Sequence, residues 1–258
     1  MHVLDWRSAD SYARQQAYDR AGFAWEILRR NAAYGRDFDR LNGLATTDPA
    51  EEARFAARWG LCFGADPKLD LEDQPVIWAP QCWPAALHVQ GACGWRGFDP
   101  LDLTALFACA DIVVQRDGDD VILCRRGARH QLWLDQCEAG AVTLVLPLDR
   151  LFDVRLAAAR RLWRELRHLP PGPAPLPLSL YARRQLGLVV RLIDAEHSGA
   201  SERDMAGAVL GLVAVSRRDW MASEGRSRLR RLIRRGHGLL DGGYLRLLNP
   251  QHGRRRWV

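Results

Sequence analysis

Two stretches in the C-terminal third of the chain repeat their apolar residues with the period of an α-helix. The apolar positions of the first stretch are Met205, Ala206, Val209 and Leu210. Their spacing places them on one helical face, and Ser201 can cap this helix together with Asp204, which replaces the usual Glu three positions later. Gly211 is a natural left-handed stop. The sequence therefore predicts a short helix over 201–211 with one buried face.

The second stretch predicts a longer helix whose outer side is basic. Its apolar positions are Leu229, Leu232, Ile233, Gly236 and Leu240. Because they recur with a period of 3.6 residues, they should line the buried side of the helix. The residues that should point outward are Ser227, Arg230, Arg231 and Arg234. Between the two helices we expect an irregular corner over residues 212–225, which is packed by Trp220.

The first 60 residues combine helical patterns with many aromatic positions. One helical face carries Phe23, Ile27, Arg30 and Tyr34. This helix should end within residues 31–35, and a shorter helix around Tyr12 should precede it. Asp48 and Pro49 form a start signal for a further helix that runs to Trp59. The aromatic row either covers the neighbouring domain or contacts another subunit or a regulatory protein.

Helical periodicity is lost between residues 76 and 146, where short β-type runs take over. The candidate strands are residues 76–78, 87–90, 112–115, 121–125, 131–134 and 142–146. Asp117, Gly118 and Gly127 are turn signals between these runs, so residues 111–135 should form an antiparallel meander. Residues 99–108 should add one or two helical turns. The pattern therefore predicts a small antiparallel sheet with helices.

Two helices and a proline-rich segment connect this sheet to the basic helices. The first helix begins near Asp149, closes the sheet domain and should bury one face. The residues of that face are Phe152, Leu156, Ala159 and Trp163. The next segment, LPPGPAPLPLSL over residues 169–180, contains five prolines and excludes a regular helix, which makes it a semi-rigid linker. The second helix buries Leu186, Val189, Val190 and Ile193 and ends near Ser198.

These patterns predict an α+β protein with four parts. They are a helical aromatic N-terminal module (1–60), a central β-sheet domain closed by a helix (61–168), a Pro-rich linker (169–178) and a helix-turn-helix domain of three helices (179–258). The net charge of +6 is concentrated in the last part, which carries 16 Arg against seven Asp or Glu. Only one of the 37 basic residues is Lys, namely Lys68, so the placement of Arg is stronger evidence than its abundance. A localised positive domain is typical of polyanion-binding modules.

The sequence offers no signature of a catalytic or cofactor site. It has neither a glycine-rich phosphate loop nor a GxSxG motif. The six cysteines form no CxxC pair, and Cys82, His88 and Cys93 match no common zinc spacing, so we expect reduced thiols rather than a metal site. No apolar run has the length of a bilayer span, and a secretory pattern is lacking. We therefore expect a cytoplasmic protein that is not an enzyme and binds no cofactor.

Two helices around a corner, with Arg and Ser on the second, are typical of a helix-turn-helix, whose second helix enters the major groove of DNA. Arginine pairs bidentately with guanine or with phosphate oxygens. The alternative interpretation is that an arginine-rich face is only a solvated surface. The candidate DNA-contacting residues are Arg217, Arg218, Arg226, Ser227, Arg230, Arg231 and Arg234. Of these, Arg217 and Arg218 should contact phosphate.

Several separate stretches also resemble one family, in the same order along the chain. Residues 179–248, with LVVRLIDAEHSGASERDMAGAVLG, DW and RSRLRRLIRRGHGLLDGGYLRLL, resemble the DNA-binding domain of RovC-like transcription factors. These factors act in type VI secretion control and as activators of integrative conjugative element transfer. Near the N-terminus, WRSADSYARQQAYDRAGFAWEILRRNAAYGRDF resembles the transcriptional-regulator-like module that accompanies this domain in proteobacterial activators.

The resemblance implies a transcriptional activator that binds double-stranded DNA, recruits RNA polymerase and assembles as a homo-oligomer, which is a hexamer in RovC-like proteins. Some relatives instead act as short antiactivators that bind a partner protein. The second hypothesis is therefore a protein-interaction module that regulates another DNA-binding protein. Such a module should carry an apolar or acidic outward face over residues 226–235, where this chain is basic.

Overall fold

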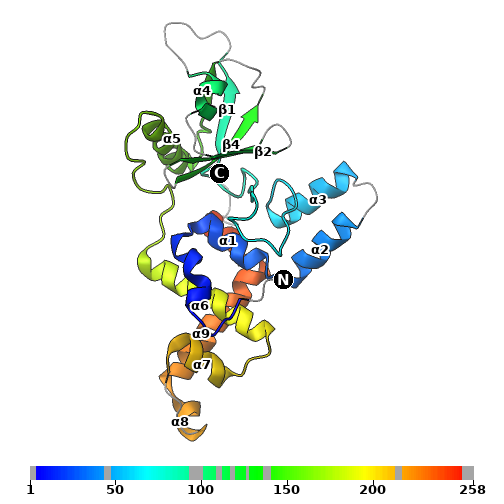
Figure 1. Cartoon of the computed structure of the whole chain (residues 1–258), viewed down its shortest axis with the longest axis vertical. Coiled ribbons are helices and arrows are strands. Elements are labelled where there is room, and N and C mark those ends of the chain that lie inside the picture. Colours follow the sequence, from blue (N-terminus) through cyan, green and yellow to red (C-terminus); the bar gives the residue numbers. More distant parts are fainter. Residues whose placement is uncertain are drawn as a thin grey trace. The chain divides into compact units, whose positions relative to one another are not determined.

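The computed structural model describes residues 4–43, 48–92, 101–108, 112–116, 120–125, 128–135, 141–212 and 217–251. The chain forms two compact units, whose elements are shown in Figure 1. Unit 1 comprises Met1–Phe55, Gly64–Gln74 and Leu178–Val258, and unit 2 comprises Ala56–Phe63 and Pro75–Pro177. Helical segments at both ends of the chain and a sheet between them confirm the predicted α+β class.

The described residues form the following elements. The helices are a 3-10 helix η1 (Asp10–Ala17), α1 (Arg20–Leu28), α2 (Ala32–Asn42), α3 (Pro49–Trp59), α4 (Leu103–Ala108), α5 (Phe152–Leu166), α6 (Leu180–His197), α7 (Glu202–Leu210), α8 (Arg217–Ala222), α9 (Glu224–Gly238), a π-helical turn η2 (Leu239–Gly243) and α10 (Tyr244–Leu248). The strands are β1 (Leu87–Gly91), β2 (Ile112–Arg116), β3 (Asp120–Arg125), β4 (Ala128–Asp135) and β5 (Val142–Val145).

Helices α6, α7 and α9 pack against one another in unit 1 (Figure 1). The residues they bury include the predicted Leu186, Val189, Val190, Ile193, Met205, Ala206, Val209, Leu229 and Leu232. Gly236 of α9 faces α6 so closely that an added Cβ would lie 3.3 Å from the Ile193 side chain, which would have to shift to make room. Ser201 and Gly211 cap α7 as predicted: Ser201 Oγ accepts from the Asp204 N–H, and Gly211 is left-handed with φ 65°.

The corner between α7 and α9 differs from its prediction. Residues 217–222 form helix α8 instead of an irregular segment, and residues 213–216 lie outside the described part of the chain. Ser223 separates α8 from α9 and caps α9, because its Oγ accepts a hydrogen bond of 3.1 Å from the Arg226 N–H. Trp220 is buried, as expected.

The N-terminal segment belongs to the same unit as the C-terminal helices. The helix predicted around residues 23–34 is in fact two helices, because the Asn31 side chain accepts from the N–H groups of Ala33 and Tyr34 and starts α2. Helix α1 packs on α6 and α10, and its aromatic residues are buried inside unit 1. Asn31 Nδ2 also donates to the Leu240 carbonyl at 2.8 Å. The aromatic row therefore covers the C-terminal helices.

Unit 2 contains a five-stranded sheet in the order β2-β3-β4-β1-β5. The meander β2-β3-β4 is antiparallel as predicted, but β1 pairs with β4 in parallel, so the sheet is mixed and not purely antiparallel. The reason is that the meander intervenes between β1 and β4 in the chain, which allows the crossover that parallel pairing needs. The turns predicted at Asp117, Gly118 and Gly127 lie outside the described residues.

Two further predictions for unit 2 are wrong. Residues 76–78 form only one bridge, Leu61 to Trp78, because the Gln131 side chain pairs with both backbone groups of Trp78. Helix α5 leaves Leu156 and Trp163 exposed, at 46% and 56%, and buries Ala158, Ala159, Leu162 and Glu165. Glu165 anchors this orientation, since its Oε2 lies 2.9 Å from His130 Nε2 on β4.

Candidate nucleic-acid interface

Helix α9 presents one buried and one exposed side. Leu229, Leu232 and Gly236 are buried, and the residues on the opposite side, Ser227, Arg231 and Arg234, are exposed. These three follow the i, i+4, i+7 spacing, so they form a row along the centre of the exposed side. The two arginines have no hydrogen-bond or ion-pair partner among the described residues. The outward orientation predicted from the sequence is thus correct for this row.

Arg226 and Arg230 lie on one flank of this row and are engaged within the protein. Arg226 Nε donates to Glu202 Oε2 at 3.2 Å, and Arg230 Nε donates to Glu202 Oε1 at 2.9 Å. Partial burial alone would raise the pKa of the Glu202 carboxyl, but the two guanidinium groups outweigh it and hold this pKa below its ordinary value. The carboxylate therefore stays ionised and ties the first turn of α7 to α9.

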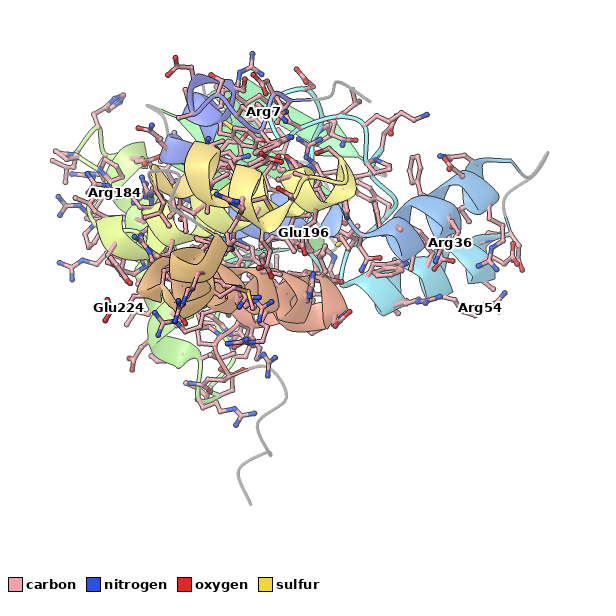
Figure 2. All side chains as sticks on the ribbon, turned by 90° about the horizontal axis from the view of Figure 1, so that it is seen from below. Arg7, Arg36, Arg54, Arg184, Glu196 and Glu224 are labelled. Carbon is pink, nitrogen blue, oxygen red and sulfur yellow. The ribbon has the colours of Figure 1, made fainter. Side chains whose placement is uncertain are left out.

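A second link on the same flank joins α9 to α6. His237 Nε2 lies 3.1 Å from Glu196 Oε2, and Glu196 is labelled near the end of α6 in Figure 2. Both side chains are substantially exposed, so this pair contributes less than a buried one. Helix α9 is thus held on one flank by acidic residues from α6 and α7, and its outer row stays open.

Sequence reasoning missed two arginines on the other flank of the row. Arg228 and Arg235 are exposed and form no ion pair within the described part of the chain. Their separation of seven residues places them on nearly the same side of the helix. That spacing is visible in the sequence and could have identified them. With them, the exposed surface of α9 is basic from its centre to one flank.

The two arginines predicted to contact phosphate lie in the first turn of α8. Arg218 is exposed, whereas the Arg217 side chain lies outside the described part of the structure. Helix α8 packs on α9, and buried Trp220 contributes to the unit's core. The structure therefore places Arg218 and the outer row of α9 on helices that touch each other, whereas Arg226 and Arg230 are partly committed to Glu202.

This surface can donate many N–H groups to a polyanion. Arginine keeps its charge at every physiological pH and offers a planar fork that matches phosphate oxygens and the guanine edge. Across the described residues, no group of three or more His, Cys, Asp or Glu side chains is placed to hold a metal ion. Among the described residues, no helix is both long enough and apolar enough to cross a membrane.

Two protein-family models match the chain. Residues 145–249 match the family described as "T6SS, Transcription factor, DNA binding domain", the RovC DNA-binding domain. This part of the chain is therefore similar to RovC-type DNA-binding domains. Residues 5–64 match the proteobacterial transcriptional regulator-like domain, so both resemblances seen in the sequence are confirmed. A comparison with curated proteins found no match. Together the two domains indicate a DNA-binding transcription factor.

The RovC-type match begins well before the basic helices. It starts at residue 145, the last residue of β5, and includes α5, the proline-rich segment and helices α6 to α10. The transcriptional regulator-like match includes η1, α1, α2 and α3. The basic surface of α9 therefore lies inside the matched DNA-binding domain.

Proposed function

We propose that this protein regulates transcription by binding specific DNA sequences, with α9 as the recognition helix of a helix-turn-helix formed by α7 and α9. The observation that carries the proposal is the row of Ser227, Arg231 and Arg234, which is exposed opposite the buried side of α9. Side chains in such a row reach base edges when a helix lies in the major groove. The RovC-type DNA-binding match supports the same assignment.

The remaining candidate residues then have supporting roles. Arg226 and Arg230 link α9 to α7 through Glu202, and the outer nitrogens of Arg230 would bind phosphate, whereas Arg226 Nη1 also donates to the Met221 carbonyl at 3.5 Å. Arg217 and Arg218 bind phosphate from α8, which lies beside α9. In this arrangement phosphate contacts orient the protein and the outer row of α9 reads the sequence.

At the promoter we propose activation through contact with RNA polymerase by a homo-oligomer of this chain. Two observations support this proposal. The chain resembles RovC-like activators, a family that forms hexamers, and residues 5–64 match the transcriptional regulator-like domain. Repeated copies of a basic helix would contact several half-sites and raise the affinity for DNA without new contacts within one copy.

The test is the affinity of purified protein for DNA from upstream of its neighbouring genes, measured by fluorescence anisotropy at rising salt. If Arg234 reads a base, Arg234→Ala should weaken binding to the preferred sequence by about 1–3 kcal/mol and relax discrimination between sequences. Arg230→Ala should instead reduce the slope of log affinity against log salt by about 0.9 if that residue contacts phosphate.

Arg36→Ala is the matched control, because Arg36 is an exposed arginine on α2, labelled in Figure 2, and its loss removes the same charge. This variant should bind DNA like the wild type. Unchanged affinity in both Arg230→Ala and Arg234→Ala, with the fold intact by circular dichroism, would refute the placement of the recognition helix.

A protein-interaction module that regulates another DNA-binding protein is the second candidate function. It requires an apolar or acidic face at residues 226–235, whereas the exposed residues there include Arg228, Arg231 and Arg234. Two results together would favour this candidate instead. The protein would bind every DNA tested weakly, with an affinity that falls steeply as the salt concentration rises, and it would form a stable complex with a partner protein.

A further inference from the structure

Unit 1 contains a cleft of about 510 Å³ between η1 and the first half of α6. Its apolar walls are Tyr12, Phe23, Leu180 and Leu188. This volume lies in the range of small-molecule sites, which combine mostly apolar walls with a few placed polar groups. The polar side chains here are three arginines and two glutamines, and three of these residues, Arg191, Arg183 and Gln15, have an unusual environment.

Arg191 is a buried cation whose hydrogen bonds go to backbone carbonyls. Its side chain lines the cleft, yet the residue is only 8% exposed. Its Nε and Nη2 donate to the carbonyls of Trp6, Arg7 and Ala208 at 3.0–3.2 Å, and no carboxylate of the described residues forms an ion pair with it. Burial lowers the pKa of Arg191, because the charged form loses its hydration, and Tyr12 and the Asp5 carboxylate offset this only in part. A charge buried in this way is stabilised by an anion brought to it.

Arg183 and Gln15 each leave a buried polar atom unpaired beside the same cleft. Arg183 Nη1 donates to the Gln16 carbonyl at 2.6 Å, but its Nε is buried and has no partner in the described structure. Gln15 is 5% exposed; its Nε2 donates to Glu26, and its Oε1 is buried without a donor. Because native proteins pair nearly all buried polar atoms, the unpaired donor and the unpaired acceptor are groups that a molecule bound in the cleft could satisfy.

Two acidic groups near the cleft, Asp194 and Glu26, are committed to other partners. Asp194 accepts from Tyr12 Oη and from two nitrogens of Arg30, and Glu26 accepts from Arg29 and Arg30. Burial, and then the Asp194 charge, raise the pKa of Tyr12 well above its ordinary value, so the phenol stays neutral and offers its ring as a wall. Arg184, labelled in Figure 2, is exposed at the same cleft. The cleft is therefore electropositive.

We propose that this cleft binds a small organic anion, a carboxylate or sulfonate with an apolar body and one N–H or O–H donor. The anionic group would pair with Arg191 and Arg183, and the donor would satisfy Gln15 Oε1. Since Arg191 also donates to the carbonyls of Trp6 and Ala208, the ligand would contact the residue that links the N-terminal segment to α7. The site exists whether or not α9 reads DNA, so the two proposals stand or fall separately.

The probe is 8-anilinonaphthalene-1-sulfonate, an apolar sulfonate with one N–H group, titrated into the full chain and followed by its fluorescence. Gly187 of α6 lines the cleft, and an added Cβ there meets nothing within 4 Å. A side chain at this position therefore starts in open space, so Gly187→Leu should occupy part of the cleft, and removing a helical glycine should not unfold α6. The variant should bind the probe at least about tenfold more weakly.

Gly35→Leu on α2 is the matched control, because an added Cβ at Gly35 also meets nothing within 4 Å and the residue does not line the cleft. It should bind the probe like the wild type. Octanoate should displace the bound probe, whereas 1-octanol, which lacks the charge, should not do so at the same concentrations. Equal probe binding by Gly187→Leu and the wild type, or equal displacement by octanol and octanoate, would overturn the proposal.

Discussion

The carboxylate of Asp194 joins the N-terminal segment to α6, and its removal is the sharpest test of how unit 1 is held together. Oδ2 of Asp194 accepts from Tyr12 Oη at 2.7 Å and from Arg30 Nη2 at 2.8 Å, and Oδ1 accepts from Arg30 Nε at 2.7 Å. The substitution Asp194→Asn keeps the volume of the side chain. It removes the charge and turns one acceptor into a donor that faces other donors.

The expected cost follows from the burial of the partners. The Arg30 side chain is 7% exposed, and that of Asp194 is 19% exposed. Breaking a buried ion pair by removing one partner costs about 3–5 kcal/mol. The Arg30 guanidinium keeps its contact with Glu26 at 2.6 Å, so the cost should lie at the low end of that range, at about 3 kcal/mol. This is a large fraction of the stability of an ordinary domain.

The assay is urea unfolding followed by tryptophan fluorescence, since Trp6 and Trp25 are both buried in unit 1. Glu196→Gln is the matched control on the same helix. Glu196 pairs with His237 at 3.1 Å, but the two side chains are 28% and 56% exposed, so its loss should cost less than about 1 kcal/mol. An Asp194→Asn protein as stable as this control would refute the inference that Asp194 anchors the N-terminal segment.

Two further predictions concern unit 2 and helix α7. Burial lowers the pKa of His130 below its ordinary value of 6.5, and the Glu165 carboxylate offsets this only in part. The unfolded chain therefore takes up the proton at a higher pH than the folded one, so unit 2 should be most stable above about pH 6.5 and lose stability as the pH falls below it. His130→Gln should make the free energy of unfolding depend less on pH between pH 7.5 and pH 5.5. An unchanged pH dependence in this variant would contradict the role given to His130. At the left-handed end of α7, with φ 65°, Gly211→Ala should cost about 1 kcal/mol in thermal unfolding. Gly207→Ala, whose added Cβ would lie 3.8 Å from its nearest neighbour, should be neutral or stabilising, and equal effects of both changes would contradict this account.

Features that depend on residues within one or two helical turns were predictable from the sequence. The cap of α7 at Ser201 and its end at Gly211 require only local hydrogen bonds and one positive φ. The exposed row of α9 follows from the spacing of its apolar residues, because a helix places every third or fourth residue on one side. The basic character of this row and the helix-sheet-helix order of the chain could therefore be predicted before any packing was known.

Features that depend on distant residues were decided by the tertiary structure. Leu156 and Trp163 of α5 have the spacing of a buried face, yet α5 turns its other side to the sheet because His130 of β4 binds Glu165. Arg226 and Arg230 share Glu202, which lies more than 20 residues earlier in the chain, so their engagement is invisible to a local pattern.

The cleft between η1 and α6 depends on pairings of the same kind. Tyr12 meets Asp194, and Arg191 meets the carbonyl of Trp6, across more than 180 residues of sequence. The sequence by itself thus determined which helices form and which of their surfaces are basic. Only the packing of distant segments decided which charges are paired and which remain available to a ligand, because a charge is paired by its neighbours in space and not by its neighbours in the chain.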